Sequence, residues 1–197
     1  ATVSYAVTTG ALTVTITGLP QAVAGMVVVA GPSNFRDTVH TTGTLTNLAP
    51  GSYTLTANNA VSGTHSYAAT PASRVVQVTA GSTPATASFS YALATGGIAL
   101  TVSGLPGTVA SDITVTGPGG YSRTVTASTL LLGLTAGSYT VAAQTVSNSG
   151  AHWAPNPASQ TVTVTPSTSA ITATVNYVTA TGGLTVSIGG LPGGVNA

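Results

Sequence analysis

The sequence predicts an all-β protein made of tandem antiparallel β-sandwiches, with about seven strands in each repeat of 86 residues. Three observations support this prediction: the chain repeats itself at a fixed offset, apolar and polar residues alternate, and turn residues separate the alternating stretches. An alternation with period two directs one face of a strand to the core and the other to solvent. Short strands of this kind, separated by regular turns, are typical of an antiparallel sandwich.

The repeat is clearest in LTNLAPGSYTLTA (45–57), which returns 86 residues later as LLGLTAGSYTVAA (131–143). One region slips in register, because GTHSYAATP (63–71) aligns with GAHWAPNP (150–157), which is one residue shorter, and one extra residue just upstream compensates for it. Surface loops tolerate such changes, so this region is expected to be a loop. Tyrosines and Gly-Leu-Pro triplets mark the same spacing, at Tyr5, Tyr91 and Tyr177 and from Gly18, Gly104 and Gly190.

The strands follow from the alternation of side chains. Leu12, Val14 and Ile16 alternate with threonines, and the same parity returns at 98–102 and 184–188. The tyrosine after each tight corner, Tyr53 or Tyr139, is expected to be buried with its hydroxyl bonded to the backbone, as buried tyrosines usually are. In the first repeat the expected strands are 11–18, 26–31, 35–40, 44–48, 52–59, 74–80 and 86–93.

Charged side chains are nearly absent from this threonine-rich chain. Among 197 residues there are three arginines, two aspartates and no lysine, glutamate or cysteine, so the net charge is +1. Such a surface offers no electrostatic attraction for nucleic acid. The longest apolar run, 22–30, is too short to span a membrane. Proteins of near-zero charge tend to associate, which favours an extracellular or cell-surface location over a crowded cytoplasm.

The pattern Leu-x-x-Leu-x-Pro-Gly-x-Tyr-x-Leu/Val, between VVVAGP and VVQVTAG stretches, resembles the prealbumin-like, Ig-like repeats of bacterial surface proteins. Collagen-adhesin B-type and carboxypeptidase-regulatory-like domains are the relatives that it resembles most. The resemblance implies tandem Ig-like sandwiches at 10–94 and 95–180, with 1–9 as the last strand of a preceding repeat and 181–197 as the first strand of a truncated third. The Lys–Asn isopeptide bond frequent in that family is impossible here, because the chain has no lysine.

Six side chains are candidates for contact with a ligand or partner. Phe35 and Tyr121 occupy matching places in GPSNFRD and GPGGYSR, where an aromatic ring can stack on a sugar or simply cover the sheet edge. The two histidines are interpreted as equivalent loop residues beside an aromatic ring, able to touch a glycan or to fill the end of the sandwich. The histidine-containing candidates are His65 with Tyr67 and His152 with Trp153.

Catalytic and metal sites find little support in the sequence. His65 and His152 each lack a nearby carboxylate or thiol in the sequence that could bind a metal ion with them. Asp37 and Asp112 do not match between repeats, and two lone carboxylates cannot build the oxygen-rich cage that calcium requires. Asp37, His40 and a serine supply the residue types of a hydrolytic triad, but a triad is recognised by geometry. We expect no cofactor and no enzymatic activity.

The expected function is therefore structural: a repeat segment of an extracellular or cell-surface stalk, fibre or filament. The alternative is an adhesin or carbohydrate-binding module that uses the aromatic candidates on cell-surface glycans. The expected partners are neighbouring repeats or further copies of the chain. Leu184, Val186 and Ile188 form an apolar alternation that predicts an assembly strand, completed by the same chain or by another copy.

Overall fold

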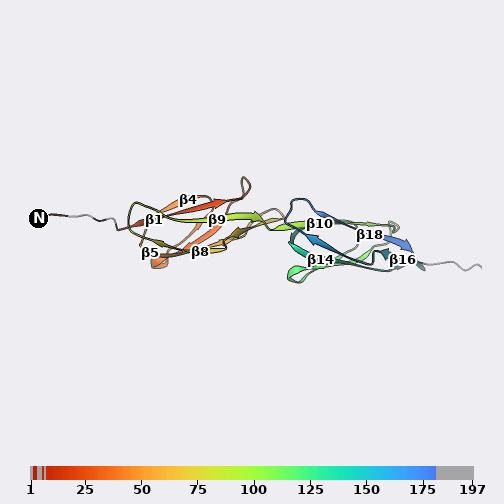
Figure 1. Cartoon of the computed structure of the whole chain (residues 1–197). Helices are drawn as coiled ribbons and strands as arrows, with labels where there is room; N and C mark the ends of the chain where they lie inside the picture. Colours follow the sequence, from red (N-terminus) through yellow and green to blue (C-terminus); the bar gives the residue numbers. More distant parts are fainter. Residues whose placement is uncertain (1, 4–5, 7, 181–197) are drawn as a thin grey trace, which may run out of the picture.

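The computed structural model describes residues 2–3, 6 and 8–180, and it forms two β-sandwiches that lie end to end (Figure 1). In this part of the chain each repeat has nine strands and no α-helix. The first repeat contains β1 (Gly10–Thr17), β2 (Met26–Ala30), β3 (Arg36–Val39), β4 (Gly43–Leu48), β5 (Gly51–Asn58), β6 (Ala60–Ser62), β7 (His65–Thr70), β8 (Ser73–Val78) and β9 (Ala85–Leu93).

The second repeat follows the same order at the same spacing. Its strands are β10 (Thr95–Ser103), β11 (Asp112–Gly117), β12 (Tyr121–Val125), β13 (Thr129–Thr135), β14 (Gly137–Gln144), β15 (Val146–Asn148), β16 (Ala151–Asn156), β17 (Ser159–Val164) and β18 (Ile171–Thr179). A single 3-10 turn precedes the third strand of each repeat, η1 (Pro32–Asn34) and η2 (Pro118–Gly120).

Each sandwich pairs a five-stranded sheet with a four-stranded one. In the first repeat the orders are β4-β1-β9-β7-β6 and β3-β2-β5-β8, and the second repeat has the corresponding orders. Most neighbours are antiparallel, as predicted, but β1 runs parallel to β9 and β10 runs parallel to β18. The first and last strands of a repeat therefore point the same way, so the chain enters at one end of the sandwich and leaves at the other (Figure 1).

Two separate cores lie between the sheets, one per repeat. The inward alternation predicted for the first strand is correct, since Leu12 and Val14 are fully buried and Ile16 packs against the same cluster. The second core repeats this arrangement around Ile98 and Leu100. Period-two burial of β-branched and leucine side chains is what drives both sheets to pack face to face.

The region predicted as a loop, 63–71, is a hairpin instead. Ala60 pairs with Tyr67 across β6 and β7, and Val146 pairs with Trp153 across β15 and β16 at the same offset of 86. The two hairpins therefore have equal length, and the expected change of one residue does not exist. These short strands account for the nine strands per repeat in place of about seven.

The corner tyrosines lie where the sequence predicted them. Tyr53 and Tyr139 are each 1% exposed. The hydroxyl of Tyr53 donates a hydrogen bond to the backbone oxygen of Ala49, and that of Tyr139 to the backbone oxygen of Thr135, both at 3.0 Å. Each bond connects the second strand of its corner, β5 or β14, to the backbone at or just past the end of the strand before it, β4 or β13.

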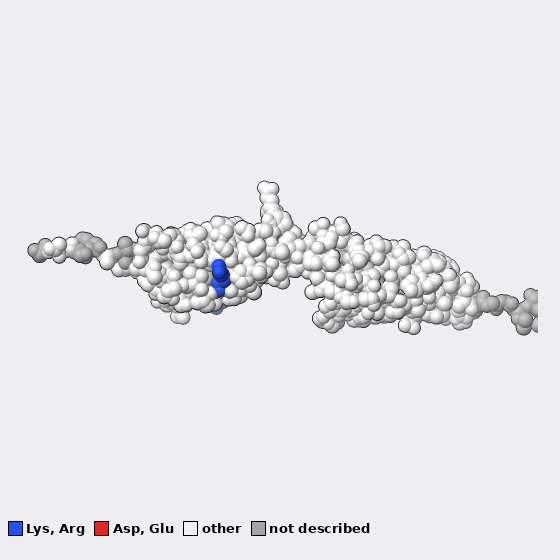
Figure 2. Space-filling model, viewed as in Figure 1, with Lys and Arg blue, Asp and Glu red and all other residues white. Residues whose placement is uncertain are grey.

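The proposed assembly strand with Leu184, Val186 and Ile188 lies outside the described residues. Of the segment 1–9, the described residues 2–3, 6 and 8–9 belong to no strand. On the face of the molecule seen in Figure 2, basic atoms appear at one place over the first repeat and no acidic atom appears, which matches the scarcity of charge in the sequence.

Candidate functional site

Phe35 and Tyr121 cover the corner tyrosines. Each follows a 3-10 turn, where its own backbone N–H donates to the oxygen of Pro32 in the first repeat or of Pro118 in the second. The ring of Phe35 meets that of Tyr53 edge-on, with 5.6 Å between centroids, and Tyr121 meets Tyr139 at the same separation. Both candidate rings are half-buried and pack on the core, which matches the edge-covering interpretation of these positions.

The two loop histidines are not equivalent. Ser62 pairs with His65 in the first hairpin, whereas the residue facing Asn148 at the same place in the second is Ala151. His152 corresponds to Ser66, one residue further, so the two imidazoles point to opposite faces of their strands. His65 is half-buried and its Nδ1 has no hydrogen-bond partner, while His152 is exposed.

The aromatic neighbours of these histidines belong to the fold. Tyr67 is buried in the first core, and Trp153 is half-buried against the second. They occupy the same place in their hairpins, facing Ala60 and Val146. Phe35 lies at the Tyr53 corner and His65, at the start of β7, lies at the opposite end of the sandwich, so the six candidates do not gather into one site.

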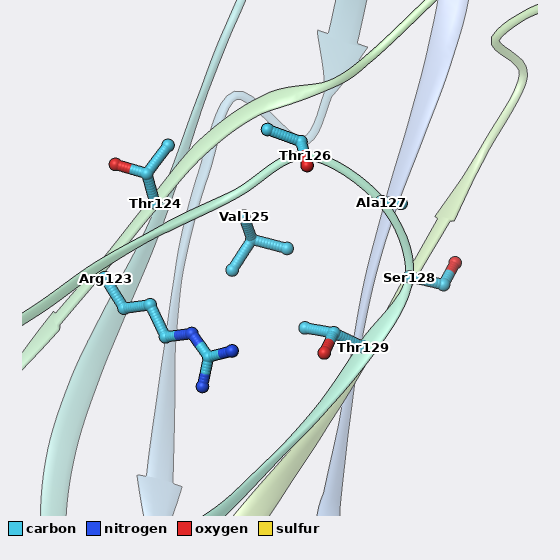
Figure 3. A pocket seen from close by; sticks show the side chains of 7 residues that line it. All are labelled: Arg123, Thr124, Val125, Thr126, Ala127, Ser128 and Thr129. Atoms are coloured by element: carbon cyan, nitrogen blue, oxygen red, sulfur yellow. The ribbon is translucent and has the colours of Figure 1, made fainter.

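The surface hollows are shallow and carry little charge. One, of about 210 Å³, lies over the turn from β12 to β13 and is lined by residues 123–129. In Figure 3 the Arg123 and Thr129 side chains flank Val125, while Thr124 and Ser128 point away from the hollow. Arg123 is the only charged side chain in it, and Ser128 is already bonded to the backbone of Val102.

A second hollow, of about 440 Å³, lies between the β1–β2 loop and β6. His40 borders it, with Nδ1 hydrogen-bonded to the backbone oxygen of Gly25 at 2.8 Å. Within the described residues no group of three or more histidine, cysteine, aspartate or glutamate side chains could hold a metal ion. No helix in that part of the chain is long and apolar enough to cross a membrane.

A short series of hydrogen bonds holds the junction between the repeats. One residue, Ala94, separates β9 from β10, and its N–H donates to the backbone oxygen of Ser66 at 2.8 Å. The N–H of Ser66 in turn donates to Oγ1 of Thr95 at 3.0 Å. The backbone oxygen of Thr95 accepts from the N–H of Ser167 at 3.1 Å. Thr95, only 7% exposed, therefore joins a hairpin of the first repeat to a loop of the second.

Both halves of this junction recur at the equivalent places. The N–H of Gly81 donates to the backbone oxygen of Thr9 at 3.1 Å, as Ser167 does to Thr95. At the far end of the second repeat the N–H of Ala180 donates to the backbone oxygen of His152 at 2.7 Å, as Ala94 does to Ser66. The sequence predicts a short junction at 91–97, but it did not identify the hydrogen bonds of Thr95, although the spacing of 86 residues between Thr9 and Thr95 was visible.

No protein-family model matches the chain, and no curated protein sequence matches it. Among solved structures it is similar to the Bacillus anthracis TIE protein, at 18% identity and a TM-score of 0.42, over 86% of this chain and 34% of that one. It is also similar to a streptococcal ancillary pilin, at 12% identity and a TM-score of 0.47, over 86% of this chain and 62% of that one. A third similar structure is the shaft pilin SpaA of Lactobacillus rhamnosus GG, at 10% identity and a TM-score of 0.38, over 90% of this chain and all of that one. The chain thus spans about a third of the first of these proteins and 62% of the second.

Proposed function

We propose that this chain is a structural segment of an extracellular or cell-surface stalk or fibre, in which β-sandwiches are joined end to end and no reaction is catalysed. Its partners are neighbouring repeats or further copies of the chain. The junction at Thr95 is the observation that carries the proposal. A flexible tether would need no such contacts, whereas here three hydrogen bonds bracket a linker of one residue.

The direction of the strands supports the same function. Because β1 and β9 are parallel, the chain leaves each sandwich at the end opposite to its entry. Every added repeat then extends the chain along one axis, by about 30–40 Å for strands of eight or nine residues and their turns. A compact arrangement of two sandwiches side by side would require the chain to turn back at the junction, for which a linker of one residue is too short.

The surface fits an extracellular setting. A nearly uncharged chain has little electrostatic repulsion to keep copies apart, so neighbouring segments can lie close together. Exposed hydroxyls satisfy their hydrogen bonds with water or with one another, as Oγ1 of Thr13 and Thr44 do at 2.9 Å.

Antibodies raised against the chain test the proposed location and assembly. We expect them to label intact cells of the source organism, in extended structures visible by electron microscopy. Labelling that requires permeabilised cells would contradict the proposal. Solution scattering on the chain tests its shape, with an expected longest dimension of at least about 60–80 Å for two repeats in line.

Carbohydrate binding remains the alternative prediction, and it has a direct test of its own. A glycan array probed with the chain, and with the Tyr121→Ala and Trp153→Ala variants, should give no signal that depends on these rings if their role is to cover the cores. A glycan signal that is lost in either variant would favour the adhesin interpretation.

A further inference from the structure

Positions 47 and 133 are equivalent in the two repeats but carry different residues, asparagine and glycine. Each lies at a β-bulge, where the pairing of β1 with β4 or of β10 with β13 shifts by one residue. Both have a positive φ, of 58° at Asn47 and 70° at Gly133. Asparagine adopts this left-handed conformation readily among residues with a side chain. The bulge therefore does not by itself require glycine at position 133.

The space around Gly133 explains the difference. A Cβ atom placed there would lie 3.0 Å from the backbone oxygen of Thr64, and no other residue comes within 4 Å of it apart from its chain neighbours. Thr64 belongs to the first repeat, in the two-residue turn that joins β6 to β7. A separation of 3.0 Å between these atoms is tighter than an ordinary contact, so the turn would have to move away from any residue larger than glycine.

A movement of that turn would reach the junction directly. Ser66 is two residues beyond Thr64, and its N–H and C=O form the hydrogen bonds to Thr95 and Ala94. The contact between Thr64 and Gly133 and the bonds of Ser66 thus lie two residues apart, at the start of β7. Displacing the turn by a few tenths of an ångström strains bonds that are already near their usual length of 2.8–3.0 Å.

We propose that the residue at this bulge determines which repeat can dock behind the hairpin of another. Glycine at position 133 admits the β6–β7 turn of the preceding repeat in the closed junction, and asparagine at position 47 excludes a turn placed in the same way. The two sandwiches therefore differ in whether a preceding repeat can dock onto them in this way. This inference rests on the proposed end-to-end assembly and names the residue that gives it order.

The test compares Gly133→Asn with the reciprocal variant Asn47→Gly. Because the chain has no cysteine, Ser52→Cys and Ser138→Cys supply one spin-label site on the exposed face of each repeat. We expect a narrow distribution of label-to-label distances in the parent chain and in Asn47→Gly, and a shifted, broader one in Gly133→Asn. Amide exchange at Ser66 and Ala94 should rise about fivefold in Gly133→Asn, the factor that corresponds to one lost hydrogen bond.

An unchanged distance distribution and unchanged exchange in Gly133→Asn would overturn the proposal. If Gly133→Asn does not fold, Gly133→Ala, which has the smaller side chain but more backbone strain at this positive φ, is measured in its place. Failure of both variants to fold would mean that the second sandwich itself requires glycine, which also overturns the proposal. The result is independent of the cell-labelling experiment, so a chain found inside cells would remove the proposed function without changing the docking preference.

Discussion

The hydroxyl of Tyr139 donates to the backbone oxygen of Thr135 at 3.0 Å, four residues earlier, across the corner between β13 and β14. Tyr53 and Ala49 repeat the relationship in the first sandwich. In each case the ring fills the core beside the corner while the hydroxyl satisfies a carbonyl of the turn, so one side chain stabilises both the packing and the corner.

Truncation of this side chain should therefore be costly. Tyr139→Ala is expected to lower the free energy of unfolding of the second repeat by about 3–5 kcal/mol, as for other buried aromatic residues. Tyr139→Phe keeps the ring and loses the hydrogen bond, so its loss should be about 0.5–1.5 kcal/mol. Chemical denaturation followed by NMR signals of each repeat measures both. A loss below about 1 kcal/mol for the alanine variant would mean that the ring contributes little to the core.

The same tyrosines predict a loss of stability in alkali. Burial raises the pKa of Tyr53, and burial together with the neighbouring Tyr121 raises the pKa of Tyr139. In the folded protein these hydroxyls keep their protons to a higher pH than in the unfolded chain. Their contribution to the free energy of unfolding is therefore fully present below the unfolded pKa of about 10. It is lost as the pH rises from there through the higher folded pKa.

Denaturation midpoints measured between pH 8 and 11 check the sign. The denaturation midpoint of the parent chain should stay constant near pH 8 and fall above about pH 10. A double variant, Tyr53→Phe and Tyr139→Phe, should start from a lower stability and lose less of it over the same interval. Equal slopes in the two proteins would assign the alkaline loss to other groups.

Thr95 gives a prediction for the junction. Thr95→Val keeps the shape of the side chain and removes the oxygen that accepts from the N–H of Ser66, leaving a partly buried donor unpaired. The expected cost is about 1–3 kcal/mol, concentrated in faster amide exchange at Ser66. Thr101→Val, at an exposed site on the same strand, is the matched control and should change exchange at Ser66 little. Thr95→Ser retains the oxygen and should behave like the parent.

Two glycines that lie against the corner tyrosines give a prediction about packing. Gly31 and Gly117 have ordinary extended backbones, but an added Cβ would overlap the ring of Tyr53 or Tyr139. Gly117→Ala should therefore cost about 1–3 kcal/mol through displacement of the ring. Gly107→Ala is a suitable control, because open space surrounds that position and the effect should stay within about 0.5 kcal/mol. Similar losses in both variants would contradict the packing argument.

Local patterns predicted the strands that bury long runs of alternating residues, and they predicted the corner tyrosines. They did not predict that β1 and β9 are parallel, because alternation is the same for either direction of pairing. The hairpin of β6 and β7 was mistaken for a loop because its strands are short and hold few β-branched residues. Aligning the two repeats on the identical letters of His65 and His152 shifted the alignment by one residue. The strand pairing places Tyr67 and Trp153 at equivalent positions, which keeps the offset at 86 residues.

The hydrogen bonds of the junction were harder to predict for a different reason. Thr95 is one of 38 threonines, and nothing in its own neighbourhood distinguishes it from the exposed ones. Its partner Ser66 is 29 residues away, and the contact of Thr64 with Gly133 spans two repeats. The sequence shows asparagine at position 47 and glycine at the equivalent position 133. The structural consequence of this difference depends on the backbone oxygen of Thr64, which lies opposite position 133.

The parallel pairing of the first and last strands also determines how a sandwich responds to tension. A pull along the rod acts on β1 from its start and on β9 from its end, so it slides the two strands past one another. Six registered pairs, from Leu12 with Ala85 to Thr17 with Ser90, then resist together. Strands pulled apart from one end would release their bonds one at a time, each with a small force. The order of strands in this fold thus places the parallel ladder of each repeat under shear when the chain is pulled from its two ends.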